Sequence, residues 1–168
     1  MGCIRMKQQT LYLICGPAGS GKTTWVKSNA TQFDSARHIS RDEIRFAMLK
    51  DGDDYFKYEK KVFRTFVNEI QKALDEGIEI VYADATHINT ASRMKTMRAL
   101  KIAENVKVIP VYFDTPLSLC LERNAMRSGR ALVPDDVIKQ MYSNKTSPID
   151  TDPYEYSGQL TINYWKGE

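Results

Sequence analysis

The sequence predicts an α/β fold in which a parallel sheet of about five strands is flanked by helices on both faces. Two observations point to this fold class. Short apolar runs that are typical of buried strands alternate with helical patterns, and this alternation requires a crossover connection between successive strands. A glycine-rich loop, Gly16–Thr23, also lies between the first strand pattern and the first helical pattern.

The size and composition of the chain indicate one globular domain over residues 1–168. The 168 residues are 42% apolar and 27% charged, which suits a single hydrophobic core and argues against a disordered or fibrous chain. No apolar run approaches the roughly 18 residues that a membrane span needs. The net charge of +3, from 24 basic and 21 acidic residues, is compatible with a polyanionic partner but does not by itself indicate one.

The N-terminal segment and the cysteines favour a cytoplasmic protein. Met1–Gln9 has basic residues but neither the apolar stretch nor the cleavage pattern of a signal peptide. Cys3, Cys15 and Cys120 are odd in number and scattered, so they match neither a disulfide framework nor the spacing of metal ligands. We expect Cys15 and Cys120 to be small core residues.

The N-terminal part of the chain is predicted to contain two strands and two helices. Thr10–Cys15 is a β-rich apolar run that ends at the glycine-rich loop, and Lys22–Ala30 is a helical pattern that opens from this loop. Arg37–Ser40 predicts a second short strand, after which the polar segment Arg41–Arg45 should open another helix.

The middle of the chain contains the longest predicted helix and a buried strand. Tyr55–Glu76 has its apolar residues on one helical face, and Gly77 ends the pattern. The apolar residues of this face are Phe56, Phe63, Phe66, Val67, Ile70 and Leu74. Ile78–Ala83 is a strongly apolar strand that runs into Asp84.

The C-terminal part continues the alternation of helices and strands. Asn89 can cap a helix that runs through about Glu104, and Lys107–Phe113 supplies the next strand. The remaining segments are a helix at Pro116–Met126, a basic loop at Arg127–Val133, a helix from Pro134 to about Asn144, a loop at Ser147–Gly158 and a last strand at Gln159–Trp165.

The glycine-rich loop is the most specific functional motif. Residues 16–23 match the phosphate-loop (P-loop) pattern G-x-x-x-x-G-K-[ST] without a mismatch, between the strand and the helix that the pattern requires. We expect the loop to bind the phosphates of a nucleoside triphosphate such as ATP, with Lys22 on the β- and γ-phosphates and the Thr23 hydroxyl on Mg²⁺. The expected nucleotide-binding residues of this segment are Gly16, Ala18, Gly19, Ser20, Gly21, Lys22, Thr23 and Thr24. The alternative is a glycine-rich turn with a surface lysine.

A P-loop fits a kinase, a GTPase switch or a motor, and the other motifs disfavour a GTPase. The D-x-x-G motif is absent, and Asn144–Ser147 is only a near match to N-K-x-D. A kinase also needs a group that takes the acceptor proton, cations that hold the acceptor and a cationic lid over the phosphates.

Charged residues near the ends of two predicted strands are candidates for the acceptor side. Asp42 and Arg45 are three residues apart, a spacing that places both on one helical face as a base and a phosphate clamp. The alternative is a helix N-terminal acid with an ordinary surface ion pair. Asp84 ends an apolar strand, where ligands of open α/β sheets bind, although it can also simply begin a turn. His87 lies near the same strand end, but a lone histidine is more often a hydrogen-bonded loop residue.

Basic residues in the segment from about 116 to 133 predict a lid. Arg123, Arg127 and Arg130 cluster in and after a helix, with Gly129 available as a hinge. Such a lid supplies positive charge to the transferring phosphoryl group. The alternative is a solvated basic face, which is the usual explanation of an isolated cluster.

Together, the motifs of residues 10–145 resemble the kinase domain of the bacteriophage polynucleotide kinase-phosphatase family. The strings GPAGSGKTTW, ISRDEIR, YFKYEKK, LERNAMR and VPDDVIKQMY carry the resemblance, together with the strand that ends in Asp84. The resemblance implies that Asp42 is the general base for a 5′-hydroxyl group and that Arg45 holds the acceptor phosphate. It also implies that Asp84 shapes the acceptor site and that Arg127 contacts the donor phosphates from the lid. The resemblance therefore predicts a P-loop kinase with ATP as donor.

Two departures from this family pattern affect the expected function. Residues 85–89 form a segment one residue longer than the family pattern, so a contact of Thr86 with the acceptor phosphate is left open. The strings Asp51–Asp53 and Asp150–Asp152 lack the flanking sequence of a phosphatase motif. We therefore expect phosphorylation of 5′-hydroxyl DNA or RNA ends, as in the repair of broken ends, without removal of 3′ phosphates.

Two other functions fit the same motifs. A small-molecule kinase similar to zeta toxins, gluconate kinases or antibiotic phosphotransferases shares the loop and the lid, and differs in its acceptor. A non-catalytic nucleotide-binding module would use the P-loop to control binding to a partner.

Overall fold

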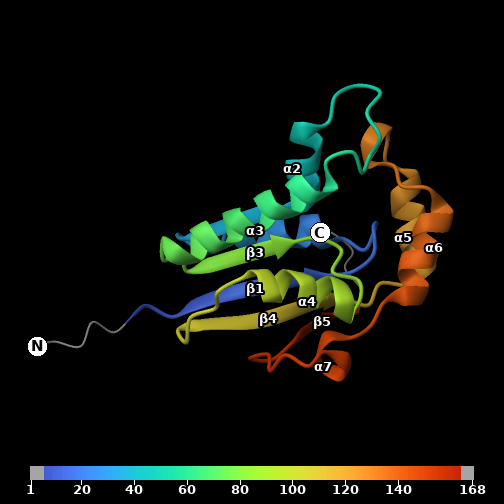
Figure 1. Ribbon diagram of the computed structural model, residues 1–168. Helices are drawn as coiled ribbons and strands as arrows, with labels where there is room; N and C mark the ends of the chain where they lie inside the picture. The colour runs from blue at the N-terminus through green and yellow to red at the C-terminus, as the bar shows by residue number, and fades with distance from the viewer. Residues whose placement is uncertain (1–5, 164–168) are drawn as a thin grey trace, which may run out of the picture.

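The computed structural model describes residues 6–163, which form a central parallel sheet with helices on both faces (Figure 1). In chain order the elements are β1 (Gln9–Cys15), α1 (Lys22–Ala30), β2 (Ala36–Ser40), α2 (Arg41–Met48), α3 (Glu59–Asp75), β3 (Ile80–Asp84), α4 (Thr90–Ala99), β4 (Val106–Phe113), α5 (Leu117–Ala125), a 3₁₀ turn (Gly129–Ala131), α6 (Asp135–Asn144), α7 (Pro148–Thr151) and β5 (Leu160–Ile162). The predicted fold class, an α/β fold with a five-stranded parallel sheet, is confirmed.

The strand order places the P-loop at the centre of the sheet. The order is β2-β3-β1-β4-β5, and every pair is parallel. The chain builds one side of the sheet from β1 to β3 and then crosses to the other side, so the carboxyl end of β1 is a topological switch point, where open α/β sheets bind ligands. At this edge Ile14 is paired in register with Asp84, and Asp84 with Ser40.

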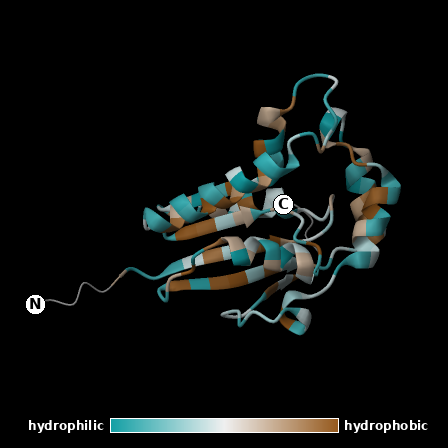
Figure 2. Cartoon of the chain, in the orientation of Figure 1, coloured by the Kyte–Doolittle hydropathy of each residue, from teal (hydrophilic) through white to brown (hydrophobic). Residues whose placement is uncertain are grey.

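Successive side chains of β1 point to opposite faces of the sheet and pack in two hydrophobic cores. Leu11 and Leu13 pack in the cluster under α3 and α4, whereas Ile14 packs with Trp25 of α1 on the opposite face. Figure 2 shows the strands largely in the hydrophobic colour and the outer helix faces largely in the hydrophilic one. A third cluster, of Ala18, Cys120 and Ile138, joins the P-loop to α5 and α6.

Local hydrogen bonds explain where the two helices next to the cleft begin. The Ser40 side chain accepts a hydrogen bond from the Glu43 N–H (3.3 Å) and caps α2. Asn89 and Ser92 form a capping box at the start of α4, so the predicted Asn89 cap is confirmed. α2 therefore starts directly at the carboxyl end of β2, and this start places Asp42 in its first turn.

Some of the predicted element bounds are wrong. Phe56 is not part of the long helix, because Asp54 ties residues 54–57 into a turn, and its side chain is 64% exposed. α4 ends at Ala99 rather than near Glu104, since Leu100 turns into an extended conformation and is buried in the core. The predicted loop at Ser147–Gly158 contains the short helix α7. Trp165, where the last strand was predicted to end, lies outside the described residues, as does Cys3.

Two further expectations are met within residues 6–163. Cys15 and Cys120 are both buried and not in disulfides, as small core residues should be. No helix of this part of the chain has the length and apolar character needed to cross a membrane.

Candidate active site

The P-loop presents its backbone N–H groups to the mouth of a cleft. Gly19 and Gly21 have φ values of +80° and +96°, which glycine adopts without strain. Within residues 6–163, no hydrogen-bond partner is found for the N–H groups of Gly19, Gly21, Lys22 and Thr23. Because these groups lie at the start of α1, they form a site for an anion such as a phosphate.

The loop is fixed against α5. A Cβ atom at Gly19 would lie 2.3 Å from the backbone oxygen of Cys120, so the loop and the helix touch through their backbones. The Ser20 carbonyl accepts hydrogen bonds from Thr115 Oγ1 (2.9 Å) and Arg123 Nη1 (3.3 Å). The position of the loop is therefore coupled to the helix that begins the predicted lid.

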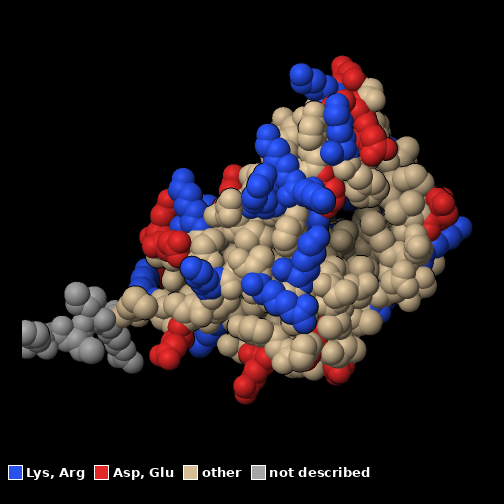
Figure 3. All heavy atoms as spheres, viewed as in Figure 1, with Lys and Arg blue, Asp and Glu red and all other residues tan. Residues whose placement is uncertain are grey.

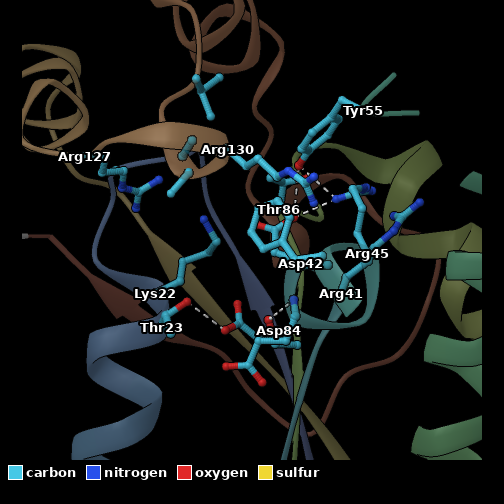
Figure 4. A pocket seen from close by; sticks show the side chains of 18 of the residues that line it. Lys22, Thr23, Arg41, Asp42, Arg45, Tyr55, Asp84, Thr86, Arg127 and Arg130 are labelled. Carbon is cyan, nitrogen blue, oxygen red and sulfur yellow. Dashed lines mark hydrogen bonds and ion pairs between the residues drawn. The ribbon is translucent and has the colours of Figure 1, made fainter. Parts of the chain in front are cut away.

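Lys22, Thr23 and Asp84 meet at the carboxyl edge of the sheet (Figure 4). Lys22 Nζ donates to the Pro17 carbonyl (2.8 Å), and burial lowers the pKa of Lys22, against the opposing effect of Asp84 and then Asp42. Thr23 Oγ1 donates to Asp84 Oδ2 (3.0 Å), which also lies 2.8 Å from His38 Nε2. A hydroxyl and a carboxylate side by side are ligands that suit Mg²⁺, so the residues present here fit this ion.

Asp42 lies at the acceptor side of the cleft and is held by two neighbours. Arg45 Nη1 and the Tyr55 hydroxyl both donate to Asp42 Oδ1, at 2.6 and 3.1 Å. Burial raises the pKa of Tyr55 to about 12, with a further contribution from the Asp42 charge, so Tyr55 remains a donor at neutral pH. Asp42 itself is exposed to the cleft, and in the described part of the chain its hydrogen bonds are made by Oδ1 and leave Oδ2 available.

Glu59 organises the two arginines of α2. Arg45 Nη2 donates to Glu59 Oε2 (2.8 Å), and Arg41 donates to Glu59 Oε1. Burial would raise the pKa of Glu59, but its bond to Arg45 and the charge of Arg41 outweigh burial and lower it. Arg45 Nη1 donates to both Asp42 and Tyr55, whereas Nη2 uses one of its two N–H groups on Glu59, so the second remains for an acceptor phosphate.

Aromatic rings complete the acceptor side. The Tyr55 ring lies 4.5 Å from the Arg45 guanidinium carbon and packs edge-on against Phe56 at 4.9 Å. Phe46 is 6.4 Å from the Tyr55 ring, and all three rings line the cleft. This side of the cleft therefore offers cations and flat apolar surface together.

The lid reaches over the cleft from the opposite side. Arg127 and Arg130 both line the cleft, and Figure 4 shows them entering it from the segment opposite Asp84. Arg130 donates to the Leu49 carbonyl and pairs with Asp51, each at 3.1 Å. The lid thus touches the segment that follows α2 and closes one side of a cleft of about 460 Å³.

The cleft brings most of the predicted site residues together. The lining includes Ala18, Gly19, Gly21, Lys22, Thr23, Thr24, Asp42, Arg45, Asp84, Thr86 and Arg127. Gly16, Ser20 and Arg123 are not in the lining. Gly16 and Ser20 are buried residues of the loop itself, and Arg123 donates a hydrogen bond to the loop backbone.

Sequence reasoning missed the supporting residues of the acceptor side. Tyr55 and Glu59 lie inside the string YFKYEKK, but Tyr55 precedes α3, and the two are linked through Arg45, which bonds to both. Arg41 stands directly before Asp42 and has no signal of its own. His38 lies two residues before the end of β2, and only the strand pairing brings it to Asp84.

His87 is a buried, hydrogen-bonded residue, in line with the structural interpretation of a lone histidine. It is 2% exposed, its Nδ1 lies 2.9 Å from the Ile14 carbonyl, and its Nε2 lies 3.0 Å from Thr96 Oγ1. Burial lowers its pKa to about 4, so the ring is neutral at physiological pH. His87 holds the loop after β3 and does not face the cleft.

Comparison with known proteins places the fold among P-loop kinases. The model of the AAA_33 family, described as an AAA domain, matches residues 11–148. The chain is similar to a protein in the structure of the Pnkp1/Rnl/Hen1 RNA repair complex, with 19% identity and a TM-score of 0.71 over 84% of this chain and 45% of that one. It thus spans less than half the length of that protein.

Two further solved structures share the fold. One is a fungal RNA kinase, with 15% identity and a TM-score of 0.64 over 98% of this chain and 78% of that one. The other is a gluconokinase from Sinorhizobium meliloti 1021, with 14% identity and a TM-score of 0.57 over 95% of this chain and 85% of that one. These similarities concern the fold and do not distinguish the acceptor.

Proposed function

The chain belongs to the AAA_33 family, and on that premise we propose that it is a kinase that transfers the γ-phosphate of ATP to the 5′-hydroxyl group of a polynucleotide. The P-loop kinase-like fold gives the reaction class. The acceptor is the finer part of the proposal and depends on the cleft.

The observation that carries the proposal is the meeting of Asp42 with Lys22 in one cleft. Asp42 counteracts the lowering of the Lys22 pKa, so the two charges interact across the space between them. A carboxylate that faces a phosphate site is the arrangement in which a base takes the proton of an attacking hydroxyl. A nucleotide-binding module without catalysis would not need such a base.

Each residue of the cleft has a separate role in the transfer of the phosphoryl group. Thr23, with Asp84 beside it, would hold Mg²⁺, which offsets the charge of the triphosphate. Lys22 and Arg127 bind the phosphoryl oxygens, and Asp42 accepts the proton of the attacking hydroxyl. Arg45 and Tyr55 keep the Asp42 carboxylate turned toward the acceptor.

The acceptor side favours a nucleotide over a neutral sugar. Arg41 and Arg45 provide positive charge for a phosphate that flanks the reacting hydroxyl, and Thr86 and Asp84 line the same cleft. The rings of Phe46, Tyr55 and Phe56 provide a surface on which a base can stack. Proteins of similar fold include a fungal RNA kinase and a component of an RNA repair complex but also a gluconokinase, so the choice of acceptor depends on the cleft itself.

Phosphate transfer to a panel of acceptors tests the proposal. With γ-labelled ATP, a 5′-hydroxyl oligonucleotide should become labelled, and the same oligonucleotide with a 5′-phosphate should not. Label on gluconate or another sugar, with none on any oligonucleotide, would instead indicate a small-molecule kinase. ATP binding without transfer to any acceptor would indicate a nucleotide-binding module.

A further inference from the structure

Five exposed basic residues gather on one face of the protein, over α3 and α4. They are Lys60, Lys61 and Arg64 on α3 and Lys95 and Arg98 on α4, and we call them the α3–α4 basic band. Both helices pack on the same face of the sheet. Figure 3 shows Lys and Arg side chains clustered on this face, beside the hollow of the cleft.

The cations of the band lack acidic partners. Within residues 6–163, no carboxylate lies within ion-pair distance of any of the five side chains, whereas Lys57 and Lys72 nearby pair with Asp53 and Glu76. The spacing within each helix, from Lys61 to Arg64 and from Lys95 to Arg98, keeps the charges on one helical face. Unpaired like charges so close together repel one another, and a polyanion would relieve this repulsion.

The band is continuous with the acceptor side of the cleft. Arg41 lines the cleft, and its guanidinium carbon lies 5.5 Å from the centre of the Phe63 ring. Lys95 Nζ of the band lies 4.4 Å from the centre of the same ring. Two cations therefore share one ring, so Arg41, which is paired with Glu59, connects the acceptor site to the band on α3 and α4.

The chemistry of the band points to a phosphodiester backbone rather than to bases. Phe63 is only partly exposed and is covered by the two cations, so it does not offer a free stacking surface. Contacts of lysine and arginine side chains with phosphates position a strand without depending on its sequence. None of the five band residues is in the lining of the cleft, so a ligand confined to the cleft would not touch the band.

We propose that the α3–α4 basic band binds the backbone of the acceptor strand downstream of its 5′ end, so that the enzyme prefers long acceptors over short ones. This inference rests on the proposed function. It adds that the substrate is a strand, held over several nucleotides by its phosphates and without sequence preference.

Acceptor length and salt test the inference. The variant Arg64→Gln/Lys95→Gln removes one cation from each helix, and Lys27→Gln/Lys107→Gln removes the same charge from exposed positions away from the band. The KM of each protein is measured for a 5′-hydroxyl 20-mer and for a dinucleotide with the same first two nucleotides. Thermal unfolding of both variants checks that the fold is intact.

We expect the KM for the 20-mer to rise on the order of ten-fold in the band variant and to stay within about two-fold in the control, because each lost phosphate contact forgoes the release of a counterion. The slope of log KM against log salt concentration should fall by about 1.4 for two lost contacts with a single strand. The KM for the dinucleotide should be the same in all three proteins.

Two results would overturn the inference while leaving the proposed function intact. One is an equal KM of the wild-type protein for the dinucleotide and the 20-mer. The other is phosphorylation of the 20-mer with the same KM in the band variant and in the control. If no oligonucleotide accepts phosphate at all, the proposed function fails, and the inference fails with it.

Discussion

Replacing Gly19 with alanine should damage the P-loop through two separable effects. The residue has φ of +80°, so a Cβ atom costs about 1–2 kcal/mol of backbone strain. The same atom would lie 2.3 Å from the Cys120 oxygen and 3.1 Å from its carbonyl carbon. Because these are backbone atoms of α5, no rotamer change relieves the clash, and a shift of the loop or the helix costs about 1–3 kcal/mol more.

Gly77 provides the matched control, because it has φ of +74° and a Cβ atom at this position would meet no other group within 4 Å. Gly77→Ala should therefore show the strain alone. We expect Gly19→Ala to unfold at a temperature roughly 2–12 °C below Gly77→Ala in a thermal melt, from the additional 1–3 kcal/mol. ATP should stabilise Gly77→Ala as it does the wild-type protein, and Gly19→Ala much less. Equal melting temperatures and equal ATP effects for the two variants would refute the close packing of the loop on α5.

Three further predictions concern the buried histidine, the lid and the base. The pKa of His87 is about 4 in the folded chain against 6.5 when unfolded, so the unfolded chain binds a proton first as the pH falls. The stability that the neutral ring contributes to the folded chain is therefore complete above pH 6.5 and is lost as the pH falls toward 4. In urea unfolding, the wild-type protein should lose about 2 kcal/mol of unfolding free energy at pH 5 through this residue, and His87→Gln should not. Identical pH profiles of the two proteins would contradict this prediction. Arg127→Ala should raise the KM for ATP and leave the KM for the oligonucleotide unchanged, whereas unaltered kinetics would remove Arg127 from the donor site. Tyr55→Phe, which deletes the 3.1 Å hydrogen bond to Asp42, should lower kcat by about 2–12-fold, and an unchanged kcat would exclude this positioning role.

The fold could be predicted from the sequence because its signals are local. The apolar run of β1, the loop and the start of α1 depend on neighbouring residues, and α1 is found at Lys22–Ala30 as predicted. The predicted element bounds are wrong where contacts between residues far apart in the sequence determine where a helix begins or ends. The side chain of Gln71, on α3, bonds to the backbone of Lys101 just after the end of α4, and the turn before α3 depends on Asp54.

The candidate site could be predicted only in part for the same reason. Asp42 and Lys22 belong to motifs with fixed spacing, and they line one cleft. His38 comes from an unremarkable strand and reaches Asp84 only because β2 pairs with β3. Arg123 is basic, as expected of a lid residue, yet only the three-dimensional structure shows that it donates a hydrogen bond to the carbonyl of Ser20.

The central claim is that Asp42 takes the proton of an acceptor hydroxyl while the P-loop holds ATP. The most direct measurement is single-turnover transfer of label from ATP to a 5′-hydroxyl oligonucleotide by Asp42→Asn, with ATP binding measured alongside. Glu43→Gln, which neutralises the adjacent exposed acid of α2, is the control. We expect Asp42→Asn to bind ATP normally and to transfer phosphate about 10²–10⁴-fold more slowly, whereas Glu43→Gln should stay near the wild-type rate. Near wild-type transfer by Asp42→Asn would contradict the central claim.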